Sequence, residues 1–187
     1  MLNLKSISHS FGDHVVLQDQ NLTLYPGQRI ALMGPSGRGK TTLLRIVLEL
    51  LKPVSGTVEN SFQKTTVVFQ EPRLLPWRTA LENVNLVLGD GKNTLETAKK
   101  YLEMVNLSDA ADKYPRELSG GMQQRVSVAR ALAAEGDLLI LDEPFKAMDE
   151  VLQEQVIELV NRTDAAILLV THEESEAKAL GCKIIRL

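Results

Sequence analysis

The sequence has a single cysteine and no long apolar stretch, and both absences narrow what the protein can be. Cys182 is the only cysteine among 187 residues, so no disulfide can form within the chain. The longest run of purely apolar residues is 165–170, whereas a helix needs roughly 20 such residues to span a bilayer. The chain is therefore not itself a membrane channel.

Basic side chains are in slight deficit. The chain has 21 Lys and Arg against 24 Asp and Glu, a formal net charge of −3. Because nonspecific nucleic-acid binding depends on a basic surface, this balance argues against nucleic acid as a partner. The N-terminal stretch MLNLKSISHS lacks the basic and then apolar pattern of a secretory signal, which predicts a cytoplasmic chain.

Apolar patterns predict strands that alternate with helices. Alternating apolar residues up to Leu24, followed by the turn Pro26-Gly27, favour an antiparallel sheet at the N-terminus. Later apolar runs are short and continuous, as in buried parallel strands, although buried helix fits the same pattern. These runs are 29–33, 65–69, 138–142 and 166–170. Helical periods occupy 40–51, 81–88, 94–105, 121–134, 150–160 and 175–180.

One region contains helical periods and no strand-like run. It extends from about 72 to 134, between two of the predicted buried strands. We therefore expect a single α/β domain over residues 1–187, with a parallel core sheet, an N-terminal antiparallel lobe and a helical lobe inserted at about 72–134.

The stretch GPSGRGKT follows the predicted strand 29–33 and opens a helix, which is the context that a phosphate-binding loop requires. Its glycines let successive N–H groups point at one anion, and Lys40 neutralises the outer phosphates. Thr41 offers a hydroxyl to Mg²⁺, and Thr42 can reach an inner phosphate. A glycine-rich turn with an incidental lysine is the alternative. The predicted loop comprises Gly34, Pro35, Ser36, Gly37, Arg38, Gly39, Lys40, Thr41 and Thr42.

Two carboxylates end the predicted strand 138–142, where ligands of open α/β sheets gather. In P-loop nucleotidases the acid closing this strand holds Mg²⁺, which makes Asp142 a metal-ligand candidate. Glu143 is then placed to polarise a water for attack on a γ-phosphate as a general base. Alternatively, both acids simply cap the segment behind Pro144.

Three other polar side chains are candidates with structural alternatives. His172 follows the predicted strand 166–170 and could donate to a γ-phosphate, or it is a satisfied structural histidine. Gln70 could contact Mg²⁺ or water, or start a turn before Pro72. Ser119, at the start of LSGGMQQRVSVARALA, could cap a helix or bind an anion through its hydroxyl and nearby amides.

The order of these motifs resembles the ATP-binding cassette ATPases over essentially the whole chain. GPSGRGKT, VVFQEP, LSGGMQQR, LLILDEP and VTHEE succeed one another as they do in that family. The resemblance implies a P-loop nucleotide hydrolase that uses ATP and Mg²⁺. It also implies a dimer of two cassettes, in which Ser119, Gly120 and Gly121 close over the γ-phosphate bound by the opposite chain.

The resemblance carries further roles over to matching positions. Phe11 matches the aromatic that stacks on adenine, although by itself it would indicate core or hairpin packing. Gln70 matches the residue that links Mg²⁺ to a membrane partner, Asp149 the acid that crosses the dimer interface, and His172 the γ-phosphate sensor. Lys146 and Met148 depart from the family pattern, in which a small residue and a leucine are usual, and this puts contacts across the dimer in doubt.

The segment FQEPRLLPWRTALENV is similar to the part of importer cassettes that receives a helix from a permease. Its Leu74, Leu75 and Trp77 would form an apolar patch for that partner, or would pack inside the helical lobe. The stretch EPRLLPW resembles the corresponding stretch of nitrate, sulfonate and taurine uptake cassettes. The resemblance thus implies a subunit on the inner face of the membrane that powers import of a small solute such as an organic or inorganic anion. Its partners would be a second identical cassette, a permease and a solute-binding protein.

Two other functions remain open at this point. One is a non-transport cassette of a ribosome-associated or DNA-repair complex, although such relatives usually carry two cassettes or a long coiled coil, and neither is present. The other is a module that holds nucleotide without turnover, which the presence of Glu143, His172 and Gln70 disfavours.

Overall fold

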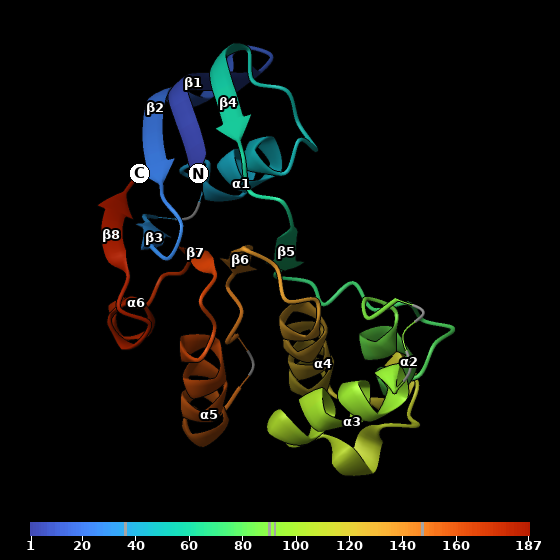
Figure 1. Cartoon of the computed structure of the whole chain (residues 1–187). Coiled ribbons are helices and arrows are strands. Elements are labelled where there is room, and N and C mark those ends of the chain that lie inside the picture. The colour runs from blue at the N-terminus through green and yellow to red at the C-terminus, as the bar shows by residue number, and fades with distance from the viewer. Residues whose placement is uncertain (36, 90, 92, 147) are drawn as a thin grey trace.

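The structure is a computed structural model that describes residues 1–187 except 36, 90, 92 and 147. Figure 1 shows a small N-terminal sheet at the top, a second sheet across the middle, and most helices below it. The strands are β1 (Leu2–Phe11), β2 (His14–Leu24), β3 (Arg29–Met33), β4 (Ser55–Asn60), β5 (Thr65–Val68), β6 (Leu138–Asp142), β7 (Ala166–Val170) and β8 (Lys183–Arg186). The helices are α1 (Lys40–Val47), α2 (Ala80–Asn85), α3 (Thr94–Met104), α4 (Gly120–Ala133), α5 (Glu150–Asn161) and α6 (Glu174–Ala179), with short 3-10 turns at Ser108–Ala110 and Pro115–Glu117.

The two sheets have the directions that the sequence predicted. The N-terminal sheet has the order β2-β1-β4, with antiparallel neighbours. The larger sheet has the order β5-β6-β7-β3-β8, and each neighbouring pair is parallel. All five residues of β6 and of β7 are buried, which explains why these strands form continuous apolar runs in the sequence.

Three clusters of buried side chains hold these layers together. The first joins the N-terminal sheet, α1 and one face of the parallel sheet. The second joins the opposite face of that sheet to α4, α5 and α6. The third lies among α2, α3 and α4 and contains no strand residue. Helix α4 therefore contributes to both the sheet core and the helical core, and it connects the two.

Boundaries differ from the sequence prediction by a few residues. The run predicted as 65–69 ends as a strand at Val68, and the helix predicted to start at 81 begins one residue earlier, because Thr79 and Glu82 form a capping box. The helix predicted to reach 51 ends at Val47 and is followed by Glu49 with a positive φ of 57°. Strand β4 was not predicted, since five of its six residues are exposed and carry no apolar alternation.

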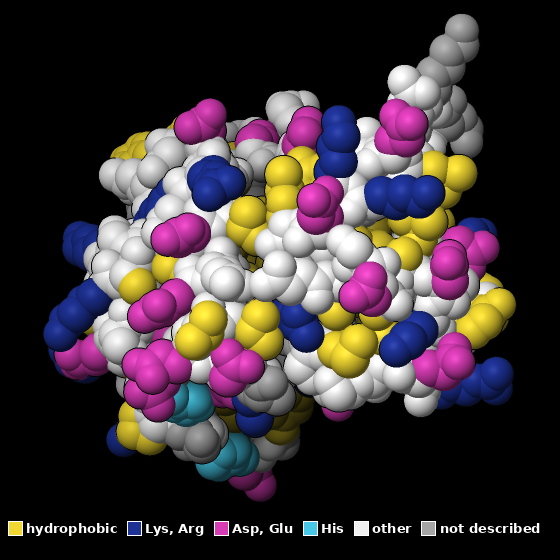
Figure 2. Space-filling view, turned by 90° about the horizontal axis from the view of Figure 1, so that it is seen from below, with side chains coloured by type: hydrophobic (Ala, Val, Ile, Leu, Met, Phe, Trp, Pro, Cys, Tyr) yellow, Lys and Arg dark blue, Asp and Glu magenta, His cyan; other side chains and the backbone are white. Residues whose placement is uncertain are grey.

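The face seen from below in Figure 2 carries acidic and basic side chains interspersed with apolar ones. This mixture fits the small formal net charge of −3. None of the helices in the described part of the chain combines the length and apolar character that a membrane crossing requires.

Candidate functional site

The loop between β3 and α1 curls around the ammonium group of Lys40. Lys40 is buried, and its Nζ donates to the carbonyl oxygens of Gly34 at 2.6 Å and Pro35 at 3.0 Å. Gly39 stands at the helix N-cap with a φ of 86°, and none of the described side chains caps the first turn of α1. Within the described part of the chain, the N–H groups of that turn are therefore not used by a capping side chain, as an anion site at a helix N-terminus requires. Ser36, which belongs to the predicted loop, lies outside the described residues.

Glycine at position 39 also serves close packing. A Cβ there would lie 2.6 Å from Leu17 Cδ2 and 2.9 Å from the Val16 carbonyl oxygen, so strand β2 leaves no room for a side chain. The positive φ adds a second reason, because residues with a Cβ are strained in that region. Position 39 thus fixes the loop against the N-terminal sheet.

The predicted metal ligand Asp142 is the last residue of β6 and is only 6% exposed. Burial raises the pKa of its carboxyl above the ordinary value, and the neighbouring Glu143 charge raises it further, whereas Lys40 and Arg45 act in the opposite sense. A buried carboxylate of this kind is stabilised by a cation nearby. Asp142 therefore has the surroundings expected of a metal ligand.

Glu143 lies at the centre of a polar cluster. Its Oε1 lies 2.8 Å from Nε2 of His172, and its Oε2 accepts a hydrogen bond from Nε2 of Gln70 at 3.1 Å. Lys146 Nζ is 3.5 Å from the same Oε2. The structure thus brings together the candidates Gln70, Glu143 and His172 from the ends of β5, β6 and β7.

The backbone of Glu143 is strained at this point. Its φ is 45°, in the left-handed region that glutamate rarely adopts, and its N–H donates to the Val170 carbonyl at 2.9 Å. Such a conformation costs about 1–3 kcal/mol and is found mostly at functional sites. The strain is consistent with a role for Glu143 beyond capping the segment before Pro144.

A cavity of about 290 Å³ opens in front of this cluster. It extends from the exposed ring of Phe11, at the end of β1, past the glycine loop to Glu143. Phe11 is 52% exposed, and its ring meets the buried ring of His9 edge to face with centroids 4.8 Å apart. The cavity is lined by Phe11, Val16, Gly37, Gly39, Lys40, Thr41, Thr42, Gln70, Glu143 and His172.

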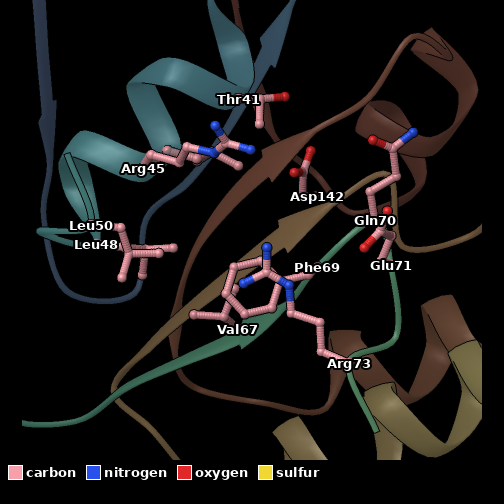
Figure 3. A pocket seen from close by; sticks show the side chains of 11 residues that line it. Thr41, Arg45, Leu48, Leu50, Val67, Phe69, Gln70, Glu71, Arg73 and Asp142 are labelled. Carbon is pink, nitrogen blue, oxygen red and sulfur yellow. The ribbon is translucent and has the colours of Figure 1, made fainter.

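A second cavity of about 140 Å³ lies beside α1, and the three predicted metal ligands are all in its wall: Thr41, Gln70 and Asp142 (Figure 3). A hydroxyl, an amide oxygen and a carboxylate form a hard oxygen donor set of the kind that suits Mg²⁺. At the other end of this cavity, Arg73 stacks its guanidinium 3.9 Å from the centroid of the Phe69 ring.

The remaining predicted residues lie outside both cavities. Ser119 caps α4, since its Oγ accepts from the Met122 N–H at 3.2 Å, and Gly120 and Gly121 form the first turn of that helix. Asp149 caps α5 by accepting from the Leu152 N–H at 2.9 Å. The capping role considered for Ser119 is confirmed, whereas a phosphate contact by Ser119, Gly120, Gly121 or Asp149 requires a surface that this one chain does not supply.

Helix α4 is hydrogen-bonded to the segment that carries Gln70, a connection that the sequence reasoning missed. Gln124 Nε2 donates to the Phe69 carbonyl at 3.1 Å, and Arg130 donates to the carbonyls of Pro72 and Arg73 at 3.0 Å each. A signal was present in the sequence. Gln124 shares the buried face of α4 with apolar residues four and seven positions along, and a buried polar side chain needs a partner.

The apolar residues predicted to face a partner behave differently from one another. Trp77 is 70% exposed, whereas Leu74 and Leu75 are half-buried, and Leu74 packs against the helical core. The two positions that depart from the family pattern also differ: Lys146 approaches Glu143, and Met148 packs against the sheet core.

The chain is similar to known proteins over nearly its whole length. The family model described as ABC transporter matches residues 17–146. The aliphatic sulfonates import ATP-binding protein SsuB 3 of Rhodococcus jostii is 43% identical over 188 residues, which cover 98% of this chain and 70% of that protein. The bicarbonate transport ATP-binding protein CmpD of Synechocystis sp. is 42% identical, with 93% of this chain and 68% of that protein covered.

A solved structure has the same fold. It is a dimeric post-hydrolysis state of the ATP-binding cassette MJ0796 bound to ADP and Pi. The TM-score is 0.90 at 32% sequence identity, and the match covers 100% of this chain and 94% of the other. The predicted α/β P-loop fold is confirmed.

Proposed function

The chain belongs to the ABC transporter family, and from this premise we propose that it is the ATP-hydrolysing subunit of an importer for a small anion. The observation that carries the proposal is that Lys40, Glu143 and His172 line the same cavity. The relatives reported above are import or transport subunits for sulfonates and bicarbonate, which favours transport over a ribosome-associated or DNA-repair role.

Nucleotide binding would use the loop and the exposed aromatic ring. Lys40 would exchange its two carbonyl contacts for the β- and γ-phosphate oxygens, a stronger charge-assisted interaction. The backbone N–H groups of the loop 34–42, except at Pro35, which has none, would line the phosphates. Phe11 would stack on adenine with its exposed surface, while the edge-to-face contact with His9 holds the Phe11 ring in place.

Thr41, Asp142 and Gln70 would hold Mg²⁺ in the second cavity. When bound, the ion neutralises charge on the β- and γ-phosphate oxygens. The raised pKa of Asp142 is consistent with this assignment, because a carboxylate buried without a cation is costly to ionise.

Hydrolysis would depend on the cluster around Glu143. Its carboxylate is placed to accept a proton from the attacking water, while Gln70 and His172 each hold one of its oxygens and fix its orientation. When ATP is bound, His172 could instead donate this N–H to the γ-phosphate, where negative charge develops. Because Gln70 donates directly to Glu143, a movement of the segment that carries Gln70 would change the orientation of the Glu143 carboxylate.

A complete site would need two chains. Ser119, Gly120 and Gly121 at the start of α4 would complete the phosphate site of a second copy, and Asp149 would face the same interface. Capping and phosphate binding are compatible, since a Ser Oγ that accepts from Met122 N–H can still donate its own proton.

The permease would contact the segment that follows Gln70. Trp77 offers a large exposed apolar surface, and the carbonyls of Phe69, Pro72 and Arg73 tie this segment to α4. Contact with a membrane partner would thus be transmitted to Gln70 and to the helix that begins at Ser119. We place the protein on the inner face of the membrane, as one cassette domain with its helical lobe at about 72–134.

Uptake measurements test the proposal. Lys40→Ala would be placed in the native host, and uptake of labelled ethanesulfonate, bicarbonate and nitrate measured beside a wild-type control. Loss of uptake of at least one anion is expected. Full uptake of all three by Lys40→Ala, combined with MgATP hydrolysis by the purified wild-type chain, would refute the anion importer while leaving the ATPase intact.

A further inference from the structure

A buried carboxylate that the proposed hydrolysis does not use lies behind His172. Glu176, in the short helix α6, is only 8% exposed. Burying a carboxylate is costly unless it is hydrogen-bonded, so such a side chain needs specific partners. Both of its oxygens have one.

The first oxygen contacts the turn that carries His172. Thr171 Oγ1 donates to Glu176 Oε2, and the same Oγ1 accepts from the Glu173 N–H at 3.0 Å. In the sequence, His172 stands between Thr171 and Glu173. The hydroxyl of Thr171 therefore closes the backbone turn at His172, and Glu176 fixes the orientation of that hydroxyl. The residue Thr171 is only 2% exposed.

The second oxygen contacts a different helix. Gln153 Nε2 donates to Glu176 Oε1 at 3.2 Å. Gln153 lies in the first turns of α5, and its N–H donates to the carbonyl of the capping residue Asp149 at 2.9 Å. Glu176 thus joins the start of α5 to the turn at His172.

The surrounding charges leave the carboxylate dependent on these two partners. Burial raises the pKa of Glu176, and the charges of Glu173 and Glu143 raise it further, whereas the Thr171 hydrogen bond and His172 act in the opposite sense. An apolar residue at position 176 would avoid this cost, but it would leave Thr171 and Gln153 without their acceptor.

We propose that Glu176 is a positioning residue that holds His172 against Glu143 and ties its position to α5. The inference rests on the proposed function, because only there does the place of His172 matter for turnover. His172 Nε2 lies 2.8 Å from Glu143 Oε1, so a small rotation of the turn breaks the contact. Gln153, Glu176 and Thr171 thus connect α5 with the turn that places His172 against Glu143.

Thr171→Val tests the proposal with little change of shape. Valine removes the hydroxyl that joins Glu176 to the turn, while the position after β7 keeps a β-branched residue. We expect kcat for MgATP to fall about 10- to 100-fold, with the dissociation constant for MgATP nearly unchanged. The matched control is Thr163→Val, just before the opposite end of β7, where Thr163 Oγ1 accepts from the Ala165 N–H at 3.2 Å in the same manner. The control should keep wild-type kcat.

Glu176 itself is tested by a pair of variants. Glu176→Ala removes the acceptor and should lower kcat as Thr171→Val does. Glu176→Gln should restore most of the loss, since the amide oxygen can accept from Thr171 and the Gln153 amide can turn to accept from the new N–H. Glu174→Ala removes an exposed carboxylate from the same helix and should leave kcat unchanged.

A spectroscopic measurement separates this inference from the proposed function. The chain has three histidines, so the ring resonances of His172 can be assigned with His172→Gln and compared with those of His9 and His14 as internal references. Thr171→Val should shift the His172 signals and spare the other two, even if the wild type shows no ATPase activity. Unchanged His172 signals in folded Thr171→Val, together with wild-type kcat, would overturn the positioning role.

Discussion

Replacing Glu143 with glutamine removes the charge of the general base with almost no change of shape. The amide oxygen of the new side chain can still accept from Gln70 or from His172, and either Gln70 or the new side chain can turn its amide to avoid two donors meeting. The strained backbone at φ 45° stays as it is, because glutamine fits that region no better than glutamate. Glu143→Gln should therefore fold as the wild type does, but it should lose most of its ATP hydrolysis.

The size of the effect follows from the role. A positioned general base contributes roughly 10²- to 10⁴-fold to the rate, which corresponds to about 3–5 kcal/mol of activation free energy. Nucleotide affinity should change much less, because Lys40 and the loop amides are untouched. Removing the Glu143 charge should also lower the pKa of Asp142 toward its ordinary value, since that charge helps to raise it.

Phosphate release under saturating MgATP measures the rate, and size-exclusion chromatography with MgATP measures the consequence for assembly. Glu143→Gln should turn over at least about 100-fold more slowly than wild type and should accumulate as a dimer. Glu154→Gln, an exposed acid on α5, is the control and should behave as wild type. A Glu143→Gln protein that stays monomeric with wild-type turnover would remove Glu143 from its assigned role.

Three other changes probe separate parts of the site. Lys40→Ala should weaken ATP binding by about 1.5–3 kcal/mol, roughly 10- to 150-fold, because a charge facing the phosphates is lost; undiminished binding in calorimetry would count against the loop assignment. Asp142→Asn should raise the unfolding temperature at pH 7 without nucleotide, because burial raises the Asp142 pKa and its ionised form costs stability as pH rises above the ordinary value of 3.8. That gain should shrink as the pH is lowered toward 3.8. The Asp142→Asn variant should also have lower Mg²⁺-dependent turnover than the wild type. An unchanged melting profile across this pH range would contradict the destabilisation assigned to the ionised Asp142. Arg130→Met removes both hydrogen bonds to the segment after Gln70 and should lower kcat with little change in nucleotide affinity. The control Arg116→Met changes an exposed arginine and should keep the wild-type kcat and nucleotide affinity. Equal kinetics for the two variants would show that the connection is only structural.

The parallel sheet and the phosphate loop were predictable because their signals are local. Strands buried on both faces form continuous apolar runs, and the loop needs glycines and a lysine at fixed spacing, so β6, β7 and the turn before α1 followed from short stretches. The convergence of Gln70, Glu143 and His172 was predictable for a related reason. Each follows a parallel strand, and the carboxyl ends of such strands meet at one edge of the sheet.

The missed features depend on contacts between distant segments. Strand β4 is held by pairing with β1, and its exposed residues give no apolar pattern. Gln124 and Arg130 reach carbonyl oxygens some 55 to 58 positions away, and carbonyls leave no trace in the choice of residue. Glu176 follows the same rule, because its partners Thr171 and Gln153 lie outside its own helix.

The central claim is that a working site is built from the Lys40 loop of one chain and Ser119 of another. Mixing Ser119→Ala with Lys40→Ala chains tests it, because a heterodimer places both defects in one composite site and leaves the second site whole. Turnover and nucleotide-dependent cross-linking should be measured on the mixture and on each variant alone. The account predicts that both variants fold, since the helix cap lost in Ser119→Ala costs only about 1 kcal/mol of stability. Each variant alone should be nearly inactive, and mixing them should restore partial turnover or nucleotide-dependent closure. If mixing restores neither, or if Ser119→Ala alone turns over at the wild-type rate, Ser119 acts only as the cap of α4.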